Sequence, residues 1–135
     1  MPFVTLSNEN RIYYELTGPE DGPIVMQFGG SLFGRHNFGF VNDGFRERGF
    51  RLLSFDATGY GRSDCPNEEH SVEKWADEGA LLLDALGFDR VFVHGTSMGG
   101  MVTQGMLLDH PKRIISAVIA DSRHTTTPEF TDDWH

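Results

Sequence analysis

The five residues 95–99, Gly-Thr-Ser-Met-Gly, constrain this chain more than any other part of its sequence. They follow an apolar run at 90–94 that is typical of a buried β-strand, and they precede a stretch at 98–110 that can form a helix. A strand, a sharp turn and a helix in this order lift the central serine clear of the sheet. The two flanking glycines fit such a turn, because neither carries a Cβ atom that would crowd the backbone. The segment therefore predicts a strand, turn and helix with Ser97 at the apex of the turn.

Ser97 is then a candidate nucleophile for acyl transfer. Met98 is expected to begin the helix, so its amide would point to where negative charge collects on an attacked carbonyl oxygen. The alternative is a glycine-rich turn whose serine only caps the helix, since a motif this short can occur by chance. The strand and helix signals on either side favour the nucleophile. Fast acyl transfer also requires a base to accept the serine proton and an acid to orient that base.

The rest of the chain alternates between strand and helix patterns. Strands are expected at 3–6 and 11–16, in an apolar run that starts at residue 24, and at 51–55, 90–94 and 114–120. Helices are expected at 37–48, from a cap at Ser71 to Gly87, and at 98–110. The first two strands would form an antiparallel hairpin. The alternation that follows predicts an α/β fold with a mostly parallel sheet of about six strands and flanking helices. The run 114–120 is so apolar that burial on both faces is expected.

Length, charge and cysteine content narrow the possible functions. A chain of 135 residues is expected to form one domain, 1–135, and Cys65, the only cysteine, leaves no internal disulfide to support it. The net charge of −9 argues against binding to nucleic acid or to an anionic membrane surface. The sequence has no metal-ligand spacing and no phosphate-binding glycine loop, so no metal and no cofactor are expected. The start lacks a basic segment followed by an apolar one, which predicts a cytoplasmic location.

Three segments together resemble the α/β-hydrolase superfamily. The first is the turn around Ser97. The second is the run 24–31, where the family has a strand followed by an oxyanion loop, and the third is the turn 59–64, Gly-Tyr-Gly-Arg-Ser-Asp. The resemblance implies that the amide of Gly30 is the second oxyanion donor. Phe28 stands where many members have a histidine.

The resemblance covers residues 3–122, which correspond to about the amino-terminal half of the family fold. Members usually carry the acid after a seventh strand and the histidine after an eighth, and a cap inserted beyond the sixth strand shapes the substrate pocket. The domain 1–135 is therefore expected to lack the cap and the last strands. Within the chain, Asp121 at the end of the sixth expected strand is a candidate acid, and His124 and His135 are candidate bases.

Two functions remain open from the sequence. The resemblance implies a serine hydrolase for carboxylic esters or related acyl substrates, in which Ser97 attacks the carbonyl and the amides of Met98 and Gly30 hold the oxyanion. The alternative is a catalytically incomplete fragment, or a stand-alone interaction module, that needs a partner chain. If the sheet ends at 114–120, this strand presents an apolar edge and an uncovered face, so self-association or a partner chain is expected there.

Overall fold

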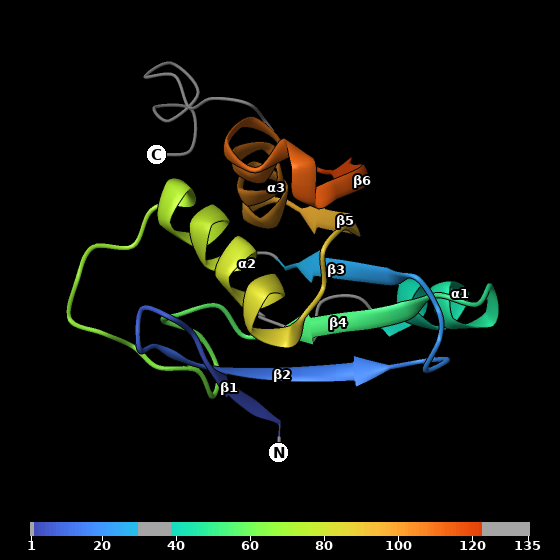
Figure 1. Cartoon of the computed structure of the whole chain (residues 1–135). Helices are drawn as coiled ribbons and strands as arrows, with labels where there is room; N and C mark the ends of the chain where they lie inside the picture. The colour runs from blue at the N-terminus through green and yellow to red at the C-terminus, as the bar shows by residue number, and fades with distance from the viewer. Residues whose placement is uncertain (1, 30–38, 123–135) are drawn as a thin grey trace.

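A computed structural model describes residues 2–29 and 39–122 of the chain. Within these residues one sheet contains the strands β1 (Phe3–Thr5), β2 (Arg11–Thr17), β3 (Ile24–Phe28), β4 (Arg51–Phe55), β5 (Val91–Thr96) and β6 (Ile114–Ala120). The helices are α1 (Gly39–Glu47), α2 (Val72–Leu86) and α3 (Met98–Asp109), and a short 3-10 turn at Pro111–Arg113 leads into β6. The strand order across the sheet is β1-β2-β4-β3-β5-β6 (Figure 1).

The sheet is mixed but mostly parallel, as the sequence predicts. β1 and β2 form the expected antiparallel hairpin, and β2 also pairs antiparallel with β4. β4, β3, β5 and β6 run parallel, with Phe28 opposite Gly95 and Thr96 opposite Ala120. These registers bring the carboxyl ends of β3, β5 and β6 to one edge of the sheet. Ser97, which directly follows β5, lies at this edge.

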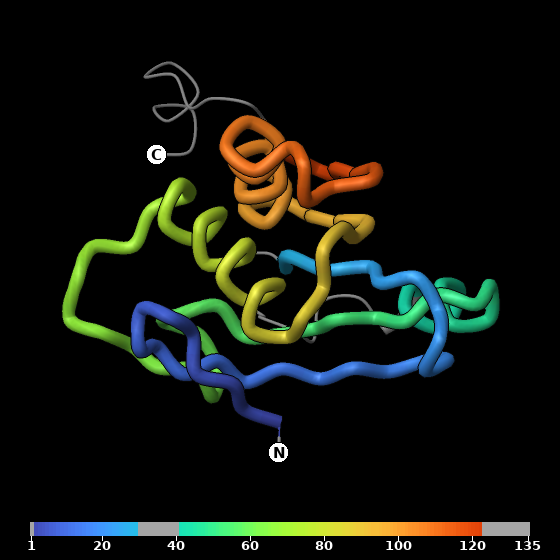
Figure 2. Tube along the Cα trace, viewed as in Figure 1, coloured from blue at the N-terminus to red at the C-terminus, as the bar shows by residue number. Residues whose placement is uncertain are grey.

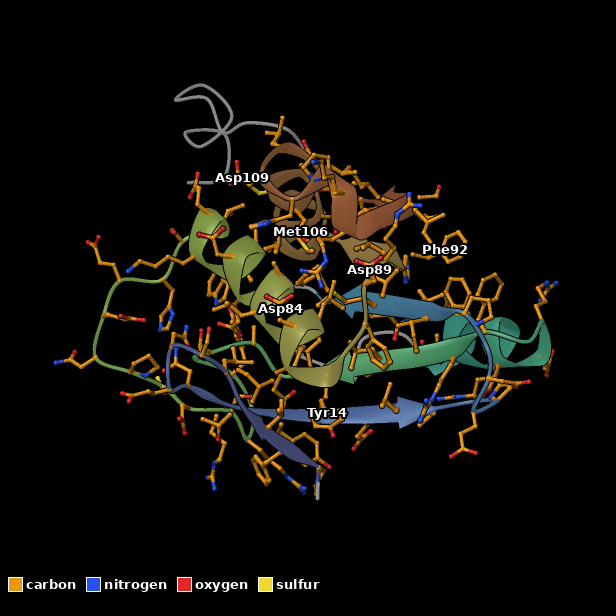
Figure 3. All side chains as sticks on the ribbon, in the orientation of Figure 1. Tyr14, Asp84, Asp89, Phe92, Met106 and Asp109 are labelled. Atoms are coloured by element: carbon orange, nitrogen blue, oxygen red, sulfur yellow. The ribbon has the colours of Figure 1, made fainter. Side chains whose placement is uncertain are left out.

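Helices pack against both faces of the sheet. α2 and α3 lie side by side on one face, and α1 lies beside β4 (Figure 1, Figure 2). Side chains alternate accordingly along β5: Val93 is buried in the core with residues of α2 and α3, whereas Phe92 contacts Phe50 next to α1. Met106 of α3, labelled in Figure 3, is fully buried, and its sulfur atom lies next to Gly79 of α2. This packing holds α3, and the turn that precedes it, against the centre of the sheet.

α2 begins and ends where its local sequence predicts. The Ser71 hydroxyl accepts a hydrogen bond from the Lys74 N–H at 3.1 Å, which satisfies one of the free donors in the first turn. Gly87 ends the helix with a left-handed φ of 77°, a conformation that a residue without Cβ adopts freely. The other expected elements are also present, although β5 extends to Thr96 and residues 37–38 of the expected first helix lie outside the described residues.

The expectation that strand 114–120 is buried on both faces is wrong. Ile114 is buried, but Ile115, Val118 and Ile119 are 47%, 57% and 40% exposed. The reason is the position of β6, which pairs with β5 and has no second neighbouring strand among residues 2–29 and 39–122. An apolar composition predicts apolar surroundings, but it does not say which part of the molecule provides them.

Candidate active site

Ser97 occupies the sharp turn that the sequence predicts between β5 and α3. It stands at the N-cap position of α3 with φ 57° and ψ −120°, which is an unfavourable backbone conformation for a residue with a side chain. Such a residue costs the fold about 1–3 kcal/mol and persists because its surroundings determine it. Ser97 is also exposed at the sheet edge. A strained and exposed serine at this place is what a nucleophile on a strand-to-helix turn requires.

The glycines on either side of Ser97 are needed for atomic reasons. A Cβ atom on Gly95 would collide with the Gly99 carbonyl oxygen and with the Thr103 hydroxyl. A Cβ atom on Gly99 would collide with the carbonyl oxygen of Phe28 at the end of β3. The buried Thr103 hydroxyl donates to the Gly99 carbonyl at 2.8 Å, which ties the first turn of α3 to its second. The tight packing that the sequence predicts for this turn is therefore present. It brings the start of α3 against the ends of β5, at Gly95, and β3, at Phe28.

The end of β6 holds the backbone of Ser97. The Ser97 N–H donates to the Ala120 carbonyl at 3.0 Å, and the Ser122 hydroxyl donates to the Ser97 carbonyl at 2.7 Å. Asp121, the candidate acid, lies between these two contacts and is exposed, with a left-handed φ of 49°. The structure thus places Asp121 at the same edge as Ser97. Whether its carboxylate serves as the acid stays a prediction.

A small apolar pocket of about 30 Å³ lies beside the turn. Its lining includes Met98 and Gly99 at the start of α3, and the aromatic residues Tyr60 and Trp75. The remaining lining residues come from the ends of β3 and β4 and from α3: Gln27, Phe28, Gly29, Phe55, Ala57 and Val102. The pocket therefore adjoins the Met98 amide that the sequence predicts as an oxyanion donor, and its lining would favour an apolar group there.

The turn after β4 is fixed by a buried carboxylate that sequence reasoning missed. Glu78 of α2 is buried and accepts hydrogen bonds from the Thr58 N–H at 2.9 Å and from the Thr58 hydroxyl at 2.5 Å. Trp75 donates its ring N–H to the Thr58 carbonyl at 3.0 Å. Burial raises the pKa of Glu78 more than the Thr58 hydrogen bonds lower it. The signal in the sequence was a glutamate on the apolar stripe of α2, between Trp75 and Leu82.

Each of the three histidines in the described ranges makes a contact that accounts for its position without a catalytic role. His94 on β5 is buried with its ring 5.7 Å from that of Phe45, and burial lowers its pKa. His110 Nε2 lies 2.7 Å from the Asp77 carboxylate. The ring of His70 stacks on Trp75 with centroids 5.6 Å apart.

Several predicted site residues cannot be placed. Gly30, His124 and His135 lie outside the described residues, so the second oxyanion donor and the candidate bases have no described geometry. Ser97 and Met98, by contrast, occupy the predicted positions at the turn and at the start of α3.

Residues 2–29 and 39–122 contain neither a membrane-spanning helix nor a metal-binding cluster of side chains. None of the helices there is long and apolar enough to cross a membrane. Within the same ranges, no three His, Cys, Asp or Glu side chains gather closely enough to hold a metal ion. Cys65 is exposed and has a free thiol.

Comparison with known proteins identifies the family. A family model described as the alpha/beta hydrolase fold matches residues 22–135. The chain belongs to this family. It is 31% identical over 124 residues to a non-heme chloroperoxidase from Streptomyces lividans, and the alignment covers 90% of this chain and 45% of that protein.

Solved structures share the same fold. A hydrolase from Pseudomonas aeruginosa matches with a TM-score of 0.83 and 28% identity, over 98% of this α/β-hydrolase chain and 49% of that one. An N-acyl homoserine lactone degrading enzyme matches with a TM-score of 0.81 and 30% identity, over 98% and 53% of the two chains. The chain spans about half the length of these relatives. The resemblance drawn from its three sequence segments, including its restriction to about half of the family fold, is confirmed.

Proposed function

We propose that this α/β-hydrolase chain provides the nucleophile and oxyanion site of a serine hydrolase for carboxylic esters or related acyl substrates such as lactones. The observation that carries the proposal is the Ser97 backbone, which is held in an unfavourable conformation at an exposed sheet edge. A serine that serves to cap α3 would accept a hydrogen bond from an N–H of the first helical turn. Ser97 makes no such bond in the described geometry, so capping does not account for its strained backbone. The similarity to a lactone-degrading enzyme supports the same substrate class.

The proposed reaction follows from the positions of Ser97 and Met98. The Ser97 oxygen bonds to the carbonyl carbon while its proton passes to a base, and the carbonyl oxygen becomes an oxyanion that accepts from the Met98 N–H and, by family resemblance, from the Gly30 N–H. The oxyanion then reforms the carbonyl, and the alcohol leaves with the proton from the base. Water then attacks the acyl carbon and gives a proton to the base, and as the carbonyl reforms the Ser97 oxygen leaves and takes that proton back, which releases the acid and restores the Ser97 hydroxyl.

The base in this scheme is assigned to residues outside the described geometry. His124 follows shortly after Asp121, and the Asp121 backbone lies next to the contacts that hold Ser97. We therefore keep His124 as the candidate base and Asp121 as its candidate acid, with His135 as the second candidate base.

A fluorophosphonate that esterifies activated serines tests the proposed function. The chain should gain one adduct, because the phosphoryl oxygen occupies the oxyanion site as a carbonyl oxygen would, and intact mass measures the adduct. Ser97→Ala should abolish the labelling. Ser7→Ala, which changes an exposed serine in the turn between β1 and β2, should label like the unchanged chain. An unlabelled chain that is folded by circular dichroism, or labelling that survives Ser97→Ala, would contradict the proposal.

The exposed side of β6 favours a second role, association with another chain. Ile115, Val118 and Ile119 are exposed, and the whole strand Ile114–Ala120 contains no charged residue. The unpaired edge of a strand can pair with another strand. We infer that the partner is a second copy of this chain, joined through β6, because an uncharged strand lets two copies of net charge −9 approach without placing like charges at the contact.

This association predicts a mass twice that of the monomer in light scattering. Val118→Lys should shift the chain to the monomer, because two copies would then bring lysines to the shared edge. Val41→Lys is the matched control, since Val41 is 47% exposed and belongs to α1 and not to the strand edge of β6. A chain that is monomeric at every concentration tested, or equal masses for both variants, would count against the dimer.

A further inference from the structure

The Ser97 carbonyl and the Met98 N–H belong to one peptide unit. In a trans peptide the two groups point in opposite directions from the same rigid plane. Any contact that fixes the direction of the Ser97 carbonyl therefore also fixes the direction of the Met98 N–H. In the proposed function this N–H is the oxyanion donor, so the partners of the Ser97 carbonyl bear on the chemistry.

Among the residues that the structure describes, three groups donate to the Ser97 carbonyl, and one differs from the others. The amides of Gly100 and Met101 donate to it at 3.0 and 3.3 Å, as expected for the first turn of a helix. The Ser122 hydroxyl donates at 2.7 Å, the shortest of the three distances. Gly100 and Met101 belong to α3 and move with it. Ser122 follows β6, so its contact ties the peptide unit to the sheet.

We propose that Ser122 is a positioning residue for the oxyanion site, holding the peptide unit of Ser97 and Met98 from its carbonyl side. This proposal rests on the proposed function for the role of the Met98 amide, but the hydrogen bond itself can be tested without it. A hydroxyl that donates to the carbonyl also polarises the peptide unit, which makes the Met98 N–H a better donor. Ser122 does not touch the reacting atoms in this scheme.

Two neighbouring residues make room for this contact. A Cβ atom on Gly100 would lie 2.5 Å from both the Cβ and the hydroxyl of Ser122, so only glycine lets the serine approach α3. Asp121 adopts a left-handed φ of 49°, and this turn of the chain lets the Ala120 carbonyl and the Ser122 hydroxyl both reach Ser97. The Ser97 backbone is thus bound on its N–H side and on its carbonyl side by residues at the end of one strand.

The first test is the kinetics of fluorophosphonate labelling. Ser122→Ala should lower the maximal labelling rate by about tenfold, as expected for a misdirected rather than an absent oxyanion donor. The concentration for half-maximal labelling and the pH midpoint should not change, because Ser122 neither binds the probe nor titrates. Ser122→Thr keeps the hydroxyl and should recover most of the rate. Ser7→Ala, in the turn between β1 and β2, is the control and should label at the unchanged rate. Equal rates for Ser122→Ala and the unchanged chain would overturn the proposal.

The second test reads the peptide unit directly. In ¹H–¹⁵N spectra of ¹⁵N-enriched protein that has not been treated with the fluorophosphonate, Ser122→Ala should shift the Met98 amide signal and speed its hydrogen exchange. Ser7→Ala should leave that signal in place. This readout needs no activity, so it separates the two proposals. If the unchanged chain does not react with the fluorophosphonate, the proposed function fails. The Met98 amide signal then still shows whether Ser122 holds the peptide unit of Ser97 and Met98. An unmoved Met98 amide in Ser122→Ala would overturn the inference.

Discussion

Replacing Gly99 with alanine should destabilise the fold by about 3 kcal/mol or more. The new methyl group would collide with the Phe28 carbonyl oxygen and lie 2.5 Å from the Gly29 carbonyl oxygen. Both are backbone atoms at the end of β3, so no side chain can turn aside to make room. α3 would have to move away from the sheet, and the contacts that hold Ser97 would move with it. Because domains of this size are stable by only about 5–15 kcal/mol, the loss is a large part of the total.

Urea unfolding measures this loss, and Gly44→Ala is the matched control. Gly44 lies inside α1, and the nearest heavy atom to a Cβ there is the end of the flexible Arg48 side chain at 3.5 Å. The control should gain about 0.5–1 kcal/mol, because alanine is the better helix former. Fluorophosphonate labelling should disappear in Gly99→Ala and persist in Gly44→Ala. A Gly99→Ala chain as stable as the unchanged one would show that α3 does not pack as closely as described.

The strand-to-helix turn could be predicted from the sequence because its signal is local. Gly95, Ser97 and Gly99 stand together between a strand pattern and a helix pattern. The same holds for α2, whose bounds follow from Ser71 and Gly87. The sequence does not show which distant atoms require these residues, such as the Phe28 carbonyl that excludes a Cβ atom at Gly99.

The features that were missed depend on residues far apart in the sequence. Ser122 meets Ser97 across 25 positions, and Glu78 meets Thr58 across 20. The exposure of β6 depends on what lies beside it in the folded sheet. No periodic pattern encodes such contacts, and the second oxyanion donor and the base are assigned only by family resemblance, since those residues lie outside the described ranges.

Replacing Glu78 should have the second large effect on stability, and its sign should depend on the substitution. Glu78→Ala removes the acceptor for the Thr58 N–H and hydroxyl, and Thr58 is only 4% exposed, so water cannot easily replace it. Leaving two buried donors without an acceptor costs about 2–4 kcal/mol. Glu78→Gln keeps one carbonyl oxygen for the Thr58 N–H, and its amide can donate to the Thr58 hydroxyl. This variant removes the buried charge while it preserves both contacts.

The pH dependence separates the charge from the hydrogen bonds. Burial raises the pKa of Glu78 in the folded chain above its ordinary value of 4.5, so the folded state holds this proton more tightly than the unfolded state does. The contribution of Glu78 to stability is therefore fully present below pH 4.5 and is lost as the pH rises through the raised pKa. Glu78→Gln has no such loss, so its stability relative to the unchanged chain should increase with pH over this window.

Urea unfolding of the unchanged chain and both variants from pH 4 to pH 8 measures this difference, because carboxylates that do not interact with Glu78 cancel in the comparison. Glu47→Gln on α1 is the control, because Glu47 is exposed and does not contribute to the pKa shift of Glu78. If Glu78→Gln lost stability relative to the unchanged chain as the pH rose, the charged form of Glu78 would be the stabilising one, contrary to the burial described. If the difference increases as expected, α2 holds the turn after β4 by hydrogen bonds despite the buried charge. Tyr60, which lines the pocket, follows Thr58 by two residues. Its position then depends on the hydrogen bonds between Thr58 and Glu78 and not on the charge of Glu78.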